Sequence, residues 1–232
     1  DYLLLIDPNN VEPIERALQN LDLGYQRQLN YRRRDGSYSA FGDQDGKGSI
    51  WLTAFVIRYL SQAKKYIYVD ETNLNSSVSW IIKRQLENGC FPWWEKFIIE
   101  IAGNNNKFYL FHKVNVKNFF LEMIFINLIT KGKTNREDSS KSLSAYILIS
   151  LIEAGISKDS PIVKNTIFCL KPNQESLGLY GDVLLSYALI LAGEYRESQT
   201  LMFELLKEAK RTYGLLWWEA DGKFLFSLFP FF

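Results

Sequence analysis

A long, glycine-punctuated loop between two expected helices constrains the fold of this chain more than any other feature. It lies between Gly24 and Val56, GYQRQLNYRRRDGSYSAFGDQDGKGSIWLTAFV. Asp35-Gly36 is a turn dipeptide, and Gly42, Gly46 and Gly48 permit backbone angles closed to other residues. Ser49 stands where an N-cap belongs, ahead of a run of large apolar residues. The stretch therefore predicts a structured loop followed by a buried helix over 50–65.

Helical periodicity dominates the rest of the chain. Apolar residues recurring at spacings of three and four predict further helices over 12–29, 71–87, 142–154, 161–170, 182–192 and 196–211. Asp70 and Ser160 are the expected N-caps, with Pro161 in a first helical turn, and Gly89, Gly155 and Gly193 are the expected stops. Leu215–Trp218 is the best strand candidate.

Three of these helices open with similar words: LTAF at 52–55, LSAY at 143–146 and LSYA at 185–188. Each begins a largely apolar helix that is followed by a more amphipathic one. A helix that is apolar on most sides must be surrounded by other helices, so the alternation indicates an inner and an outer layer. The sequence therefore predicts an all-α fold, an α/α toroid or solenoid built from repeated helix pairs.

The words themselves are more specific than the periodicity. YQRQLNYRRRDGSYSAFG followed by WLTAFV resembles the thioester-containing domain of the alpha-2-macroglobulin family, close to the macroglobulin and ovostatin branch. NGCF at 88–91, SLSAYI at 142–147 and NTIFCL at 165–170 resemble family segments in the same order. The resemblance covers most of residues 1–91 and resumes from about 132 to 220.

This resemblance implies an α/α toroid of paired helices within a large secreted, extracellular protease inhibitor. It also implies a disulfide between Cys90 and Cys169, since both fall where the family's domain carries a cysteine. From the residues alone, two buried free thiols remain an alternative.

Two segments stand apart from the family-like domain, which is expected over 1–220. Residues 92–131 are aromatic, weakly patterned and form an unmatched insert, and residues 221–232 form an apolar, unmatched tail. We interpret both as translated non-coding or alternatively spliced sequence. Such segments are aggregation hazards when nothing covers them.

Composition excludes several classes of protein and of partner. The chain is 47% hydrophobic and 15% aromatic, which excludes a disordered protein. Its 27 basic and 26 acidic residues argue against nucleic acid or an anionic membrane as a partner, and Arg32-Arg33-Arg34 is expected to be a solvated loop. No apolar run reaches the roughly 18 residues that a membrane-spanning helix needs. The chain lacks an initiator Met and a signal peptide, so we expect that it begins mid-protein or has been cut.

No catalytic, cofactor-binding or metal-binding residue is predicted. The family's Cys-Gly-Glu-Gln thioester motif is absent, and Asp1-Tyr2-Leu3 resembles the stretch shortly downstream of it. His112, the only histidine, is expected to be incidental because it lies in the unmatched insert. Asp43 and Asp45 form at most a poor calcium loop, since Lys47 replaces a ligand.

Two further patterns have competing explanations. Asn75-Ser76-Ser77 is a glycosylation sequon, whose use and non-use are both open from the sequence. Trp51, Trp80, Trp217 and Trp218 are expected to be core residues rather than a ligand cage.

The leading functional hypothesis is a fragment of a macroglobulin-type inhibitor that traps endopeptidases sterically after a bait segment is cut. This domain would shield the thioester and contact other domains of the same inhibitor. One alternative is an enzyme on an α/α toroid, a prenyl or terpenoid transferase or a glycan-processing lyase, which would need clustered carboxylates. The other is a truncated product without function.

Overall fold

The chain is mostly helical. The structure, a computed structural model, describes residues 9–92, 136–171, 176–212, 215–220 and 223–228. Its α-helices are α2 (Val11–Leu29), α3 (Ile50–Ala63), α4 (Glu71–Ile82), α7 (Arg136–Glu153), α8 (Pro161–Leu170), α9 (Leu179–Ala192) and α10 (Tyr195–Glu208). A short 3-10 helix, η1 (Gly42–Gln44), lies in the loop between α2 and α3. This content confirms the predicted all-α class.

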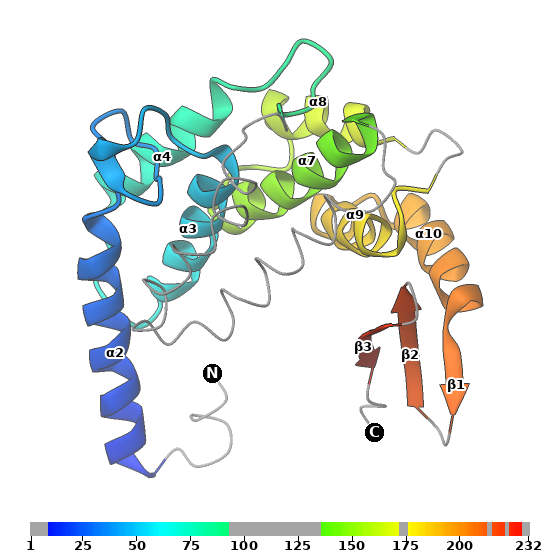
Figure 1. Cartoon of the computed structure of the whole chain (residues 1–232), viewed down its shortest axis with the longest axis horizontal. Helices are drawn as coiled ribbons and strands as arrows, with labels where there is room; N and C mark the ends of the chain where they lie inside the picture. Colours follow the sequence, from blue (N-terminus) through cyan, green and yellow to red (C-terminus); the bar gives the residue numbers. More distant parts are fainter. Residues whose placement is uncertain (1–8, 93–135, 172–175, 213–214, 221–222, 229–232) are drawn as a thin grey trace.

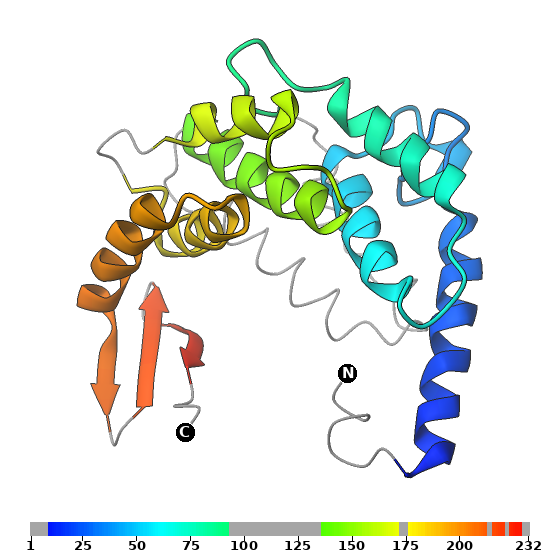
Figure 2. The same ribbon diagram turned by 180° about the vertical axis from the view of Figure 1, so that it is seen from behind.

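Six of the helices form three consecutive pairs. α3 packs against α4, α7 against α8, and α9 against α10. The first members of the pairs also pack against one another, α3 on α7 and α7 on α9. Figures 1 and 2 show the pairs following one another along an arch, with α2 at one end. The three similar words at 52–55, 143–146 and 185–188 lie in α3, α7 and α9, the helices that pack in series and are called the inner helices below.

The core lies where these inner helices meet. Seven residues of α3 are buried, among them Ile50, Ala54 and Ile57. The middle of α7 contributes a run of consecutive buried residues, from Ala145 to Ile149. All of them are fully buried except Tyr146, which is 6% exposed. A helix buried on nearly every side is apolar all round, which is why these segments show little amphipathic pattern.

The predicted N-caps explain where two helices begin. The Ser49 hydroxyl accepts a hydrogen bond from the backbone N–H of Leu52 at 3.2 Å. The Asp70 carboxylate accepts from the backbone N–H groups of Thr72 at 2.8 Å and Asn73 at 3.4 Å. Each cap satisfies donors that a first helical turn leaves without a partner. Pro161 is the first residue of α8, as predicted, although the preceding Ser160 makes no side-chain cap bond.

Two predicted helix ends were wrong. α4 ends at Ile82, and the backbone continues as a non-helical turn, so Gly89 lies within that turn rather than just beyond a helix. α10 ends at Glu208, because the chain enters a strand at Lys210. The glycine prediction for the loop was also partly wrong: Gly42 has a positive φ of 61°, whereas Gly46 and Gly48 do not have a positive φ.

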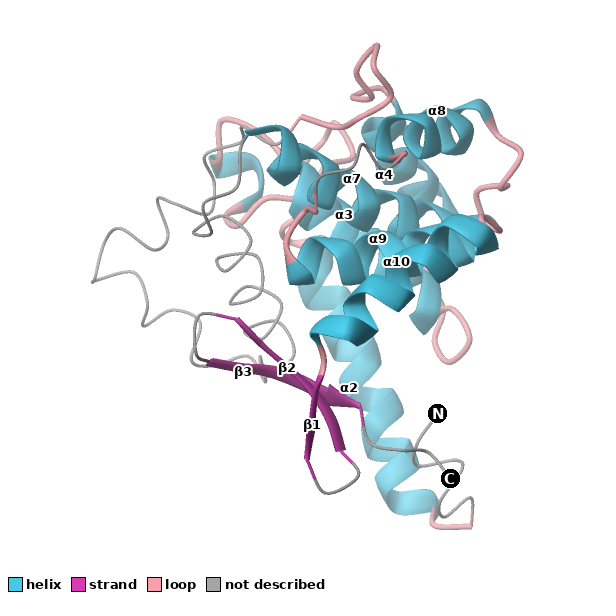
Figure 3. Ribbon diagram, turned by 90° about the vertical axis from the view of Figure 1, so that its right-hand side faces the viewer, coloured by secondary structure: helices cyan, strands magenta, loops and turns pink. Residues whose placement is uncertain are grey.

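A small antiparallel sheet follows the helices. Strands β1 (Lys210–Thr212), β2 (Leu215–Ala220) and β3 (Lys223–Leu228) lie in the order β1-β2-β3, and Figure 3 shows them beyond the end of α10. Lys210 pairs with Trp217, and Trp217 pairs with Ser227. The strand predicted at 215–218 is confirmed. Half of the apolar tail predicted at 221–232 is therefore strand β3, and its other six residues, 221–222 and 229–232, lie outside the described part of the chain.

Candidate functional site

The loop that carries the family-like wording is organised around Arg33. The Arg33 Nη1 atom donates to the backbone carbonyl of Gly42 at 2.9 Å and to that of Asp45. The Asp45 carboxylate in turn accepts from the backbone N–H of Phe41 at 2.9 Å. A guanidinium therefore satisfies two carbonyl oxygens that the loop turns inward. Arg33 therefore has a structural role, because it holds the loop together.

The basic run was expected to be a solvated loop, and that prediction was wrong for two of its three residues. Arg32 and Arg33 are half-buried, and Arg32 Nη2 donates to the hydroxyl of Ser76 on α4. Arg34 alone projects into solvent, with a side chain that is 95% exposed. The charge of an arginine in a loop does not reveal its partners: Arg33 is drawn inward by carbonyl oxygens that require a donor, and Arg32 by the Ser76 hydroxyl.

Asp35 fastens this loop to α4. Its Oδ1 accepts from the Ser37 backbone N–H at 3.0 Å and from the Ser37 hydroxyl at 2.6 Å, while its Oδ2 accepts from Trp80 Nε1 at 2.9 Å. Burial by itself would raise the pKa of Asp35. The hydrogen bonds from Ser37 and Trp80, with the charge of Arg33, outweigh burial and lower that pKa below its usual value.

The tip of the loop fits closely against α4. The Ser77 hydroxyl donates to the backbone carbonyl of Gly36 at 2.6 Å. A side chain at Gly48 would place its Cβ 2.0 Å from the Ser37 Oγ, so this glycine is required for close approach rather than for a special φ. Tyr38 is almost fully buried, and its burial raises the pKa of its phenol to about 12. Tyr38 thus anchors the loop in the hydrophobic core.

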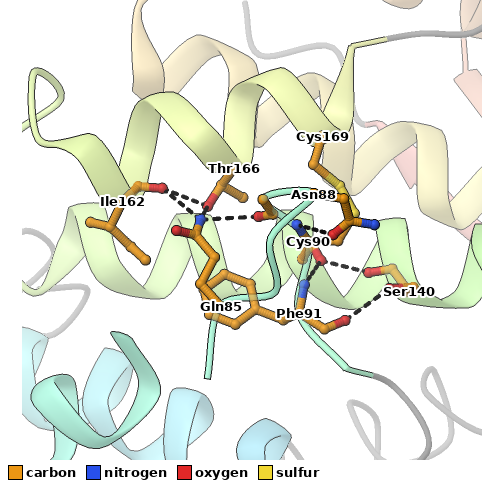
Figure 4. The surroundings of a disulfide bond; sticks show 10 residues. Gln85, Asn88, Cys90, Phe91, Ser140, Ile162, Thr166 and Cys169 are labelled. Carbon is orange, nitrogen blue, oxygen red and sulfur yellow. Dashed lines mark hydrogen bonds between the residues drawn. A yellow bond between two sulfur atoms is a disulfide. The ribbon is translucent and has the colours of Figure 1, made fainter. Parts of the chain in front are cut away.

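The two cysteines lie in a second constellation, shown in Figure 4. Cys90 and Cys169 form a disulfide with their Cα atoms 5.4 Å apart. It connects the turn after α4 to the end of α8. Gly89 lies beside the bond with a φ of 83°, and a Cβ there would lie 2.1 Å from the carbonyl oxygen of Asn165. Only glycine fits this contact without displacing the backbone of α8.

Hydrogen bonds hold both sides of this turn. Gln85 Nε2 lies 3.0 Å from each of three acceptors, the Gly89 and Ile162 carbonyls and the Thr166 hydroxyl (Figure 4). The Phe91 backbone N–H donates to the Ser144 hydroxyl of α7 at 2.8 Å. The turn after α4 is therefore attached to α8 on one side and to α7 on the other.

A polar cluster at the inner helices was not predicted from the sequence. Arg58 of α3 forms an ion pair with Glu153 of α7, and both side chains are mostly buried. Glu153 also accepts from Gln62 at 2.7 Å and from the Tyr187 hydroxyl of α9 at 3.1 Å. One carboxylate thus joins all three inner helices. The sequence does contain a sign that Arg58 needs a partner, because it is the one charged residue in the largely apolar helix α3.

The environment of this cluster shifts the pKa of two of its members, Arg58 and Tyr187. Burial would lower the pKa of Arg58, but the hydrogen bond and charge of Glu153 raise it above its usual value. Burial and the neighbouring Glu153 charge also raise the pKa of Tyr187. The cluster is a cation, an anion and neutral donors, which is a stabilising arrangement rather than an acid–base pair.

The remaining sequence candidates are dispersed. Asn75 is exposed on α4, and His112 lies outside the described residues. Trp51, Trp80 and Trp218 are buried, as predicted, whereas Trp217 is only partly buried. Across the described part of the chain, no group of three or more His, Cys, Asp or Glu side chains is placed to hold a metal ion. Within the same residues, no helix combines the length and apolarity needed to cross a bilayer.

Comparison with known proteins matches this architecture to a family. The family model described as A-macroglobulin TED domain matches residues 1–110 and 105–225, so its matches run through the segment 92–131. Ovostatin of Gallus gallus is 34% identical over 225 residues, which are 96% of this chain and 13% of ovostatin. Alpha-2-macroglobulin-like protein 1 of Mus musculus is 27% identical over 226 residues, 96% of this chain and 14% of that relative. The chain therefore spans about a seventh of the length of these relatives, and it belongs to the alpha-2-macroglobulin family through its TED domain.

Proposed function

We propose that this chain is part of a secreted, macroglobulin-type inhibitor that encloses endopeptidases after they cut a bait segment. The match to the TED domain over nearly the whole chain supports this role. In the proposal the domain is not catalytic: it shields a thioester until cleavage exposes it, and the thioester then captures amines of the enclosed protease. Closed packing suits such a role, because a labile acyl group survives only where water is excluded.

The single observation that shapes the proposal is the fate of the cysteines. The chain has two, and both are consumed in the Cys90–Cys169 disulfide. Neither thiol is available to hold an acyl group, and the sequence contains no Cys-Gly-Glu-Gln. In the proposal the reactive cysteine therefore belongs to another part of the protein, and these helices supply its surroundings. The closed α/α toroid is the corresponding proposal for the complete domain, and the paired arch of α3 to α10 supports it.

The experiment that tests this function uses the full-length protein that contains this chain. The protein is mixed with trypsin, and hydrolysis of a large protein substrate is compared with that of a small chromogenic peptide. Enclosure predicts that cleavage of the large substrate is lost while cleavage of the peptide persists. Equal loss of both would indicate an active-site inhibitor, and no loss of either would indicate no inhibitor; both results contradict the proposal.

A second measurement isolates the thioester. Pretreatment of the full-length protein with methylamine should abolish the covalent protease conjugates that survive denaturing electrophoresis. Labelled methylamine should be incorporated in a fragment other than the one containing residues 1–232. Incorporation inside this chain would contradict the assignment of the acyl group to other residues.

A further inference from the structure

An N-glycosylation sequon lies in α4, with its asparagine on the exposed face of the helix. Asn75-Ser76-Ser77 has the Asn-x-Ser form of an N-glycosylation acceptor. The structure places its first and third residues in opposite environments. Asn75 is exposed, whereas Ser77 is 1% exposed and donates its hydroxyl to the Gly36 carbonyl at 2.6 Å.

The face of α4 that carries Asn75 has room for a large group. Thr72, Asn75, Ser79 and Lys83 are all exposed, and their spacing of three and four residues puts them on one stripe of the helix. Three of the four are small and polar. The opposite stripe, with Leu74, Val78 and Ile81, is buried in the core. A glycan at Asn75 would therefore extend into solvent and displace no core residue.

The buried hydroxyl sets the order of events. An acceptor sequon is recognised through its hydroxyl as well as its asparagine, and in the folded chain the Ser77 hydroxyl lies beneath the loop tip at Gly36. The close contact of Gly36 with α4 leaves no space above it: a Cβ at Gly36 would lie 3.0 Å from the Ser76 carbonyl oxygen. The modification must therefore precede the docking of the loop 30–49 onto α4.

We propose that Asn75 carries an N-linked glycan that is added to the nascent chain, before α4 and its covering loop fold. In this transfer the Asn75 amide nitrogen forms a bond to the anomeric carbon of a lipid-diphosphate-linked oligosaccharide. The bond from that carbon to the diphosphate breaks, and the amide loses one proton. The outer face of α4 then faces solvent in the assembled inhibitor, and neighbouring domains contact other faces. This inference rests on the proposed secretion of the protein.

The test expresses the 232-residue chain behind a cleavable secretion leader in cultured animal cells. Cell lysate and medium are both treated with an amidase that removes N-linked glycans, and mobility is compared. The wild-type chain should shift on treatment, and Asn75→Gln and Ser77→Ala should not. The two variants separate the roles of the sequon: Asn75→Gln should keep the Tm of the deglycosylated wild type, whereas Ser77→Ala should lower it by a few degrees because a buried hydrogen bond is lost.

The order of events has its own measurement. Unmodified chain is offered to the solubilised transferase and its lipid-linked donor, either folded or freshly diluted from denaturant and reductant. Only the unfolded chain should be modified; equal modification of the folded chain would overturn the proposed order. A wild-type chain that reaches the medium but does not shift would overturn the glycan. A chain that shifts in the lysate but is never secreted would support the glycan and count against the proposed secreted function.

Discussion

Arg58 and Glu153 lie 95 residues apart in the chain, yet the guanidinium of one meets the carboxylate of the other through two contacts, 3.0 Å and 3.3 Å long. The rings of Tyr59 and Tyr146 lie 5.9 Å and 5.8 Å from the Arg58 guanidinium carbon. This pair helps to fix two adjacent inner helices in one register, because among the described residues neither charge has another ion-pair partner.

Replacing Glu153 by Gln should destabilise the fold by about 3 kcal/mol, because the Arg58 charge would remain mostly buried without its counter-charge. Urea unfolding of both proteins measures the difference. Glu12→Gln is the matched control: the Arg16–Glu12 pair on α2 has side chains 70% and 80% exposed, so its loss should change stability by less than about 0.5 kcal/mol. Equal effects of the two substitutions would contradict the structural role of the buried pair.

Removing the disulfide should have a comparable effect. The bond connects residues separated by 79 positions, and closing a loop of that length in the unfolded chain corresponds to about 4.5 kcal/mol of stability in the chain-entropy treatment. The double variant Cys90→Ser/Cys169→Ser should lose this amount, measured by denaturant unfolding. Reductant should lower the stability of the wild type and leave that of the double variant unchanged; a wild type that is indifferent to reductant would argue against the bond.

Gly89 and Gly24 form a second matched pair. Gly89→Ala should destabilise by about 2 kcal/mol or more, since φ is positive and the new Cβ would meet the Asn165 carbonyl oxygen. Gly24→Ala, in the middle of α2 with nothing within 4 Å of the added Cβ, should stabilise by about 0.5–1 kcal/mol. Thermal unfolding of the two variants compares them directly. A neutral Gly89→Ala would show that the turn is wider than described.

The loop around Asp35 should give the protein a pH dependence at the acidic end. Because the folded state lowers the pKa of Asp35 below its usual 3.8, this group stabilises the fold above that value. The contribution is lost as the pH falls through the lowered, folded-state pKa. The stability difference between wild type and Asp35→Asn should therefore shrink as the pH falls below the usual pKa of 3.8. It should be small, below about 1 kcal/mol, because the carboxylate is partly exposed to solvent.

Nuclear magnetic resonance titration provides a direct measurement of the same effect. Trp80→Phe removes one donor to the Asp35 carboxylate and should raise its pKa toward 3.8. An Asp35 pKa that is unchanged in this variant would mean that the indole does not hold the charged form.

The local signals in the sequence predicted local structure well. Ser49 and Asp70 were identified as caps because a short polar side chain before an apolar run has few other roles, and both make the expected bonds. The repeated words identified the inner helices. The end of α4 differs from the prediction because Leu86, four residues after Ile82, keeps the helical spacing, so periodicity alone does not mark the boundary.

Contacts between distant segments were beyond the sequence. Nothing in the spacing of Arg58 and Glu153 pairs them, because their meeting depends on how α3 and α7 cross. The same holds for Arg33, whose role depends on carbonyls that only the folded loop turns toward it. The disulfide pairing came from family resemblance and not from geometry. These three features share one cause: each is defined by tertiary placement, whereas composition and periodicity report secondary structure.

The disulfide also determines which helices of the arch unfold first. It links the first helix pair, α3 and α4, covalently to the second, α7 and α8. These four helices therefore stay together as long as the bond is intact. The third pair, α9 and α10, has no covalent link to the others. Side-chain packing and the hydrogen bond from the Tyr187 hydroxyl to Glu153 hold it in place. Applied force or heat would therefore separate α9 and α10 first, and the two disulfide-linked pairs, α3 with α4 and α7 with α8, would unfold last.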